Sequence, residues 1–111
     1  MKEAKYYRNL KNTKVYYNSI LDAIDDILER EVQKHASDPF MHGPVKCSRY
    51  LKDIETSDGS VEYLISTYHI VLDDIANMLK KKLRELGYFE IKIEFNKDEN
   101  DKFSIYVEFD Y

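Results

Sequence analysis

The stretch Phe89 to Tyr111 reads FEIKIEFNKDENDKFSIYVEFDY, and it decides the fold class. Apolar and charged residues alternate along two runs that flank an acidic segment, which is typical of two antiparallel strands with one buried face. We predict a β-hairpin whose pairing is symmetric about Glu99, with Asp98, Glu99 and Asn100 as its loop and Asn100 in the left-handed conformation. The predicted register pairs Phe89 with Phe109, Ile91 with Val107, Ile93 with Ile105 and Phe95 with Phe103.

A two-stranded sheet is only marginally stable alone, so the rest of the chain must cover its apolar face. Apolar residues recur at steps of three and four over Thr13–Ala36, which predicts a first helix and leaves open whether residues 2–12 extend it. The same period from a Ser60 cap to Leu86 predicts a second, continuous helix of about seven turns, ended by Gly87. We therefore predict a single α+β domain over residues 1–111, with the order α-α-β-β.

The connector between the predicted helices, residues 37–59, contains both prolines and two of the three glycines. A connection of this length inside a small domain usually has structure of its own. We predict an extra short helix or strand within residues 40–54. A strand there would complete the open edge of the hairpin, which a second copy of the chain would otherwise pair.

Size and composition limit the class of protein. The chain has 111 residues, of which 43% are hydrophobic and 34% charged, as in a globular domain. No apolar run approaches the length of a membrane span, the N-terminus lacks the apolar stretch of a signal peptide, and a lone cysteine suits a reducing compartment. We expect a cytoplasmic protein without membrane contact. Its lysine-rich and isoleucine-rich composition suggests an AT-rich genome such as that of a phage or mobile element.

No motif indicates catalysis or a bound metal. The side chains that suit a transition metal are His35, His42, Cys47 and His69, and their spacing matches no zinc motif. The acidic turn that begins at Asn96 fails as a calcium loop, because Asp101 stands where glycine is needed and Val107 where glutamate is needed. We expect no metal, no cofactor and no enzymatic activity.

Two acidic groups are the candidate binding surfaces. In the first helix, four carboxylates share one face: Asp22, Asp25, Asp26 and Glu29. On the outward face of the hairpin, the predicted register sets Glu90 opposite Glu108, beside Glu94, Tyr106 and Asp110, with Lys92 as the only cation. Because like charges at these spacings repel, both groups suggest a partner with a basic surface.

These observations favour a small non-enzymatic protein-binding module. Its expected role is that of an inhibitor or modulator of a cationic partner protein, of the anti-host, anti-defence or immunity type. An alternative is a nucleic-acid-associated accessory protein, although a net charge of −4 disfavours it. Its phosphate-binding residues would be Lys46, Arg49, Lys52, Lys80, Lys81 and Arg84. A further alternative is a small virion assembly component that forms homo-oligomers through the hairpin edge.

Overall fold

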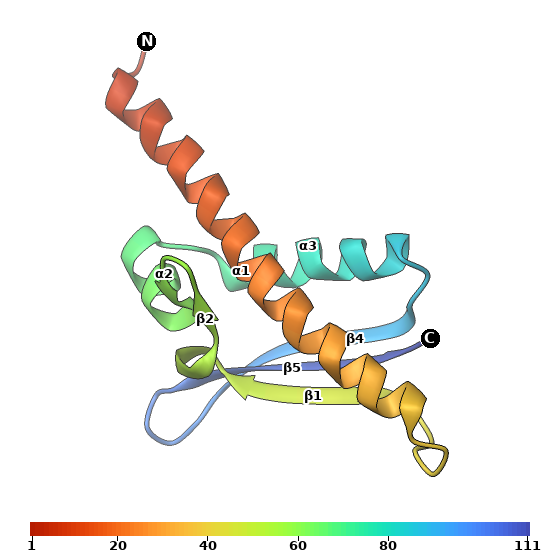
Figure 1. Ribbon diagram of the computed structural model, residues 1–111. Coiled ribbons are helices and arrows are strands. Elements are labelled where there is room, and N and C mark those ends of the chain that lie inside the picture. The colour runs from red at the N-terminus through yellow and green to blue at the C-terminus, as the bar shows by residue number, and fades with distance from the viewer.

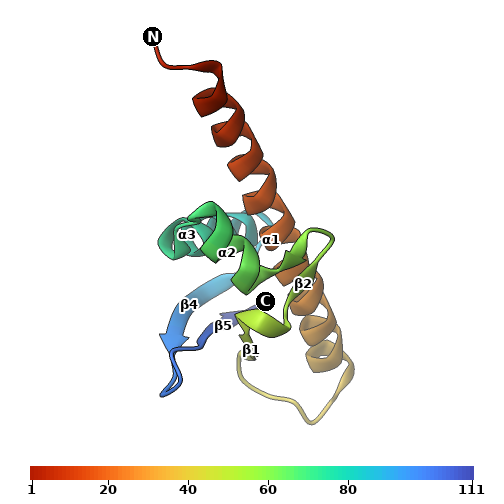
Figure 2. The same ribbon diagram turned by 90° about the vertical axis from the view of Figure 1, so that its left-hand side faces the viewer.

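The computed structural model describes the backbone of residues 1–111 and the side chains of residues 1–8 and 13–111. It confirms an α+β fold in which helices cover one face of an antiparallel sheet (Figures 1 and 2). In chain order the elements are α1 (Ala4–Ser37), β1 (Val45–Tyr50), the 3-10 helix η1 (Leu51–Asp53), β2 (Glu55–Thr56), β3 (Gly59–Ser60), α2 (Val61–Tyr68), α3 (Leu72–Glu85), β4 (Phe89–Lys97) and β5 (Phe103–Asp110).

The first helix is longer than its predicted minimum. It runs unbroken from Ala4 to Ser37, so the segment left open by the sequence extends it toward the N-terminus. It ends before Asp38 and Pro39, because a residue that precedes proline avoids the helical conformation. Its second half crosses the sheet, while its first half projects away from the other elements (Figure 1).

The prediction of one continuous second helix is wrong. The segment divides into α2 and α3 at His69, whose backbone is left-handed with φ 52°. This turn brings Ile70 into the core at 5% exposure and directs the Val71 N–H to the Tyr17 hydroxyl, 2.9 Å away. The burial of Ile70 and a partner for the freed N–H offset the loss of helical hydrogen bonds.

Both predicted ends of that segment are confirmed. The Ser60 hydroxyl accepts a hydrogen bond from the Tyr63 N–H at 3.1 Å, which is an N-cap. Gly87 has φ +95° and donates its N–H to the Arg84 carbonyl at 3.0 Å after the last turn of α3.

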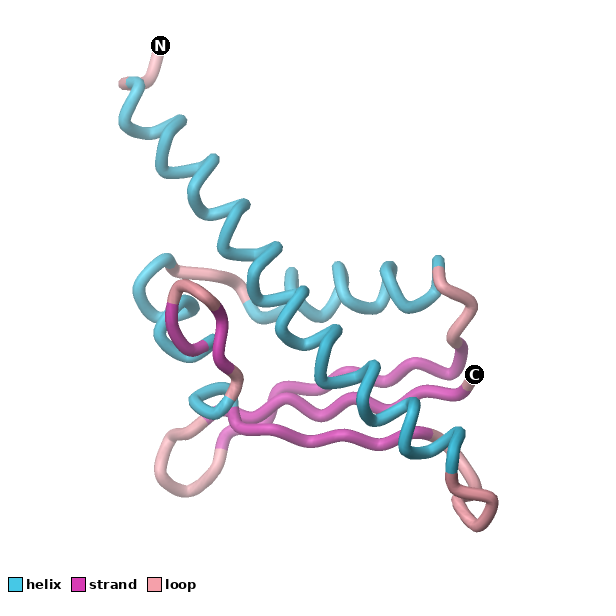
Figure 3. The backbone as a smooth tube through the Cα atoms, in the orientation of Figure 1, coloured by secondary structure: helices cyan, strands magenta, loops and turns pink.

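The connector supplies a third strand and a short helix. Strand β1 pairs antiparallel with β5, so the sheet order is β1-β5-β4 and the C-terminal strand is central. The three strands form one layer beneath α1 and α3 in Figure 3. Helix α1 packs over β1 and α3 over β4. The 3-10 helix that follows β1 buries Leu51, while β2 and β3 form a small separate hairpin.

The register of the β4-β5 hairpin differs from the prediction by two residues. Ile93 faces Val107 and Phe95 faces Ile105. Because side chains alternate with a period of two, this shift keeps Ile93 and Phe95 on one face with their partners. The predicted pair of Phe89 with Phe109 is wrong, because Phe89 lies opposite Asp110 and is 53% exposed. The loop is longer than predicted, and the left-handed residue is Asp101 at φ 61° in place of Asn100.

Asp98 organises this longer loop. Its carboxylate accepts hydrogen bonds from the N–H groups of Asn100 and Lys102, both at 2.9 Å. These backbone hydrogen bonds, that from Lys102 first, lower the pKa of Asp98. Local side-chain bonding of this kind competes with the tight loop that we predicted.

The predicted facing of Glu90 and Glu108 is also wrong. A β-bulge between Phe89 and Lys92 places Glu90 at φ 53° and shifts the pairing. Glu108 therefore faces Lys92 on β4, and it faces Lys46 on β1 at its other side. The central strand is thus flanked by opposite charges at this position.

The hydrophobic core lies between the helices and the sheet. Its fully buried large side chains are Phe109, Ile20, Leu51, Leu64, Ile75, Leu79, Val45, Val61 and Val107. Helices and strands distant in the sequence therefore share one core cluster. Among the residues whose side chains are described, no helix is long and apolar enough to cross a membrane.

Candidate functional site

The acidic residues of the hairpin lie among cations. The Tyr106 hydroxyl donates a hydrogen bond to Glu108 Oε1 at 2.6 Å, and this bond raises the pKa of Tyr106. Lys92 Nζ lies 3.5 Å from Glu94 Oε1. Asp110 pairs with Phe89 at the strand end, beside the bulge. The outward face of the sheet therefore alternates in charge where a continuous acidic patch was predicted.

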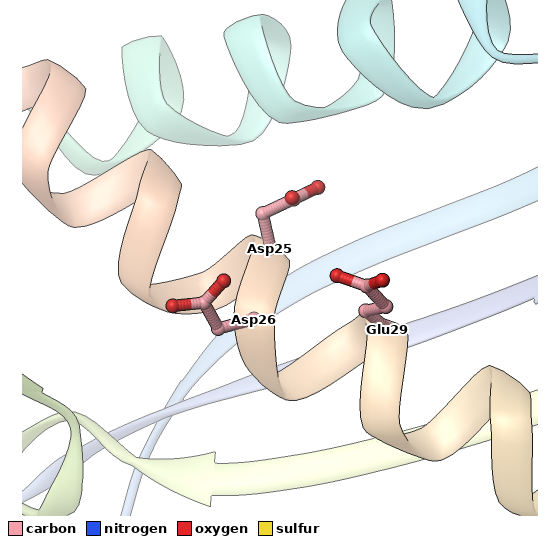
Figure 4. A group of neighbouring side chains, drawn as sticks. All are labelled: Asp25, Asp26 and Glu29. Atoms are coloured by element: carbon pink, nitrogen blue, oxygen red, sulfur yellow. The ribbon is translucent and has the colours of Figure 1, made fainter.

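The acidic residues of α1 remain together on its exposed side. Asp25, Asp26 and Glu29 each offer a carboxylate oxygen, and these atoms lie within 4.8 Å of one another. Figure 4 shows the three side chains on neighbouring turns, with Asp25 extending toward α3. Lys82 of α3 approaches from that side, with Nζ 3.9 Å from Asp22 Oδ1 and from Asp25 Oδ1. We define Asp22, Asp25, Asp26 and Glu29 as the acidic face.

The acidic face suits a cationic side chain better than an enclosed metal ion. Calcium takes six to eight oxygen ligands, which loops supply partly from backbone carbonyls. Here the carboxylates project from one helix whose own carbonyls are engaged in its hydrogen bonds. Asp26 and Glu29 are open to solvent. A flexible ammonium or guanidinium group can approach them without such a cage.

An apolar groove adjoins the acidic face between α1 and the end of α3. It has a volume of about 410 Å³. Its apolar lining comes from Leu28, Val32, Leu83, Leu86, Tyr88 and Phe109. Asp25 and Glu29 also line it, and Leu86 is 63% exposed within it. The groove therefore combines apolar walls with carboxylates from the acidic face.

The six predicted phosphate-binding residues do not form one surface. Arg49 Nη2 contacts Glu31 Oε1 of α1 at 3.0 Å, whereas Lys46, three residues earlier on the strand, points to the other face of the sheet. Lys52 Nζ lies 5.4 Å from the centre of the Tyr50 ring. Lys80 and Arg84 line a shallow hollow together with Glu90, Glu108 and Asp110. Lys81 is exposed on α3.

Of the residues considered for a transition metal, His35 and Cys47 have structural roles, whereas His42 and His69 are exposed. His35 donates from Nε2 to the Gly43 carbonyl and accepts at Nδ1 from the Tyr111 hydroxyl, both at 2.9 Å, which ties the end of α1 to the C-terminus. Cys47 is buried on β1, and burial raises the pKa of its thiol. His69 is exposed at the end of α2.

A basic segment at the N-terminus was not among the candidate binding surfaces predicted from the sequence. We define residues 1–15 as the N-terminal arm. Its cations recur every three residues, namely Lys2, Lys5, Arg8, Lys11 and Lys14, and its only anion is Glu3. The arm therefore carries +4, which leaves −8 on residues 16–111 because the whole chain carries −4. A count of charge by segment would have revealed it.

Comparisons with protein-family models, with curated proteins and with solved structures give no match. The acidic face and its groove are therefore interpreted from their own geometry.

Proposed function

We propose that the protein is a non-enzymatic binding module that docks a cationic, amphipathic segment of a partner protein along the acidic face and the adjoining groove. The observation that carries this proposal is the junction of exposed carboxylates with an apolar hollow, since Asp25 and Glu29 belong to both. Such a module would act as an inhibitor or modulator of its partner, as immunity and anti-defence proteins do.

The charges of the acidic face are incompletely compensated. Lys82 meets Asp22 and Asp25 only at 3.9 Å. Among the described side chains, no lysine or arginine nitrogen comes within 4.0 Å of the carboxylate oxygens of Asp26 or Glu29, and Arg30 Nε instead donates to the backbone carbonyl of Asp26 at 3.3 Å. Like charges at these helical spacings each cost a few tenths of a kcal/mol. A cationic partner would relieve this repulsion and gain attraction.

The groove accounts for the amphipathic part of the proposed partner. Leu86 is largely exposed at its edge, and the Tyr88 ring packs edge-on to Phe109 at a centroid distance of 5.0 Å. Lysine and arginine bury their methylene stems on such surfaces while their charged ends reach carboxylates. An amphipathic helix with aliphatic residues at steps of three and four and basic residues beside them would place both kinds of side chain at once.

The test uses a fluorescently labelled helical peptide of lysine and leucine residues, with the leucines at steps of three and four. Glu29→Lys is expected to weaken binding about tenfold in fluorescence anisotropy, because it replaces attraction by repulsion at the groove. The matched control is Glu99→Lys, which makes the same change in net charge at the exposed hairpin loop. Equal loss of binding in both variants, or no binding by the wild-type protein, would contradict the proposal.

A further inference from the structure

We propose that the N-terminal arm of one molecule docks antiparallel on the acidic face of a second copy, so that two α1 helices form a twofold-symmetric dimer. This inference rests on the proposed function, because it requires the acidic face to bind a cationic helix. The cationic helix would come from a second copy of this chain.

The arm is helical from Ala4 onward, and its described side chains are exposed apart from that of Thr13, which is half-buried. Tyr6 and Tyr7 are 42% and 52% exposed, and Val15 is 53% exposed. Directly after the arm, Tyr16 stacks on Tyr68 of α2 at a centroid distance of 3.9 Å. A helix of about three turns is marginal in water unless packing supports it. The exposed side chains of Tyr6, Tyr7 and Val15 are therefore available to a partner.

One side of α1 changes sign along its length. Eighteen residues, about five full turns, separate Arg8 from Asp26, so the two positions share a side of the helix. Eleven residues, about three turns, separate Lys14 from Asp25 with the same result. This side is cationic in the arm and anionic over the sheet.

An antiparallel pair of such helices is complementary along its whole length. With a twofold axis near Asn18, Lys14 of each copy faces Asp22 of the other, and Arg8 lies beside Glu29. The symmetry repeats each contact, as in any isologous interface. A parallel pair would instead set like charges against each other. Near the axis stand the exposed Asn18 and Val15, which leave the centre free of charge.

A second copy fits this surface better than a nucleic acid does. A polyanion lying along the arm would meet the carboxylates of Asp22 and Asp26 on the same side of the helix, and residues 16–111 carry −8. Phosphate binding needs a basic surface along the whole contact. The second copy supplies an opposite charge at both ends. Its arm would also occupy the acidic face, so that the dimer and an outside partner compete.

The test is sedimentation equilibrium of the full chain. Arg8→Glu with Lys14→Glu reverses the arm, and Asp22→Lys with Glu29→Lys reverses the acidic face. Each double variant is expected to weaken dimerisation at least about tenfold at low salt. An equimolar mixture should regain dimers. In the mixed pair the reversed, anionic arm meets the reversed, cationic face, and the wild-type arm meets the wild-type acidic face. The control Lys81→Glu with Arg84→Glu makes the same change in net charge as the arm variant, but on α3, and should leave the dimer unchanged.

Three results would contradict the proposed dimer. The first is a wild-type protein that sediments as a monomer at every concentration. The second is a dimer that neither charge reversal weakens, as pairing through the hairpin edge would give, and the third is a mixture of the two variants that stays monomeric. If the wild-type protein is a monomer that binds duplex DNA, and the arm variant loses that binding, then the arm binds nucleic acid and not a second copy. A monomer that still binds the lysine-leucine peptide through Glu29 would overturn the dimer alone and leave the proposed function intact.

Discussion

The two parts of α1, the arm and residues 16–37, belong to one unbroken helix, yet they have opposite surroundings. In residues 16–37 the side chains of Ile20, Ile24 and Leu28 are at most 3% exposed and belong to the core cluster. In the arm Tyr6 and Tyr7 are exposed to solvent. Both parts of α1 keep the helical spacing of apolar residues. This pattern alone therefore does not distinguish a helix that packs in the core from a helix that is exposed in the monomer.

The difference separates stability from binding within one element. Residues 16–37 stabilise the domain through their sheet-facing side and present the acidic face on the other. Tyr6 and Tyr7 of the arm are exposed and are not among the partly buried residues that pack on the core, so we expect that substitution of either leaves the domain folded. Substitutions along α1 should therefore have stability costs that fall steeply between residues 20 and 15.

The largest expected effect is that of Ile20→Ala, with Val15→Ala as the matched control. Ile20 is fully buried, and truncation there leaves a cavity, so we expect a loss of about 2–5 kcal/mol in unfolding free energy. Val15 is half exposed, and its truncation should change the free energy by less than about 0.5 kcal/mol. Urea unfolding of dilute protein at high salt measures both. Equal costs would show that the arm packs within the monomer.

The next effect lies at the boundary between the two parts of α1. Tyr17→Phe removes the hydroxyl that accepts from the Val71 N–H at 2.9 Å, where α2 and α3 separate. We expect a loss of about 0.5–1.5 kcal/mol, toward the lower end because water can replace the hydroxyl at this exposed N–H. Tyr6→Phe in the arm is the control. A Tyr17→Phe variant as stable as the wild type would mean that the bond does not support the break.

The alternation and the helical period of apolar residues predicted which segments are strands and which are helices, because these patterns reflect which side of each element is buried. The apolar face of the hairpin was predicted correctly beyond the bulge, since a register shift of two preserves it, but wrongly at Phe89, which lies opposite Asp110 in place of Phe109. The register itself depends on the Asp98 side chain in the loop and on the bulge at Glu90, neither of which hydrophobic pattern encodes. The break at His69 depends on Tyr17, which is distant in sequence.

The same reasoning explains which surfaces could be predicted. The acidic face follows from spacing within one helix, so Asp25, Asp26 and Glu29 were found together. The hairpin acids required a correct cross-strand register, and Glu108 proved to face lysines. The arm was missed because the net charge of the whole chain conceals two segments of opposite sign.

The smallest expected effect concerns the acidic part of α1 alone. Glu29→Gln removes one charge beside Asp25 and Asp26, at helical spacings of four and three residues. Because like charges there repel, the variant should gain about 0.2–0.5 kcal/mol in unfolding free energy at low salt. The gain should vanish near 1 M salt, where charges are screened beyond about 3 Å. Glu99→Gln, in the hairpin loop, serves as the control. Urea unfolding at both salt concentrations measures the difference. A loss of stability in Glu29→Gln would show that this carboxylate is already compensated within the folded chain, and compensation there would contradict the proposal that a cationic partner relieves repulsion at Glu29.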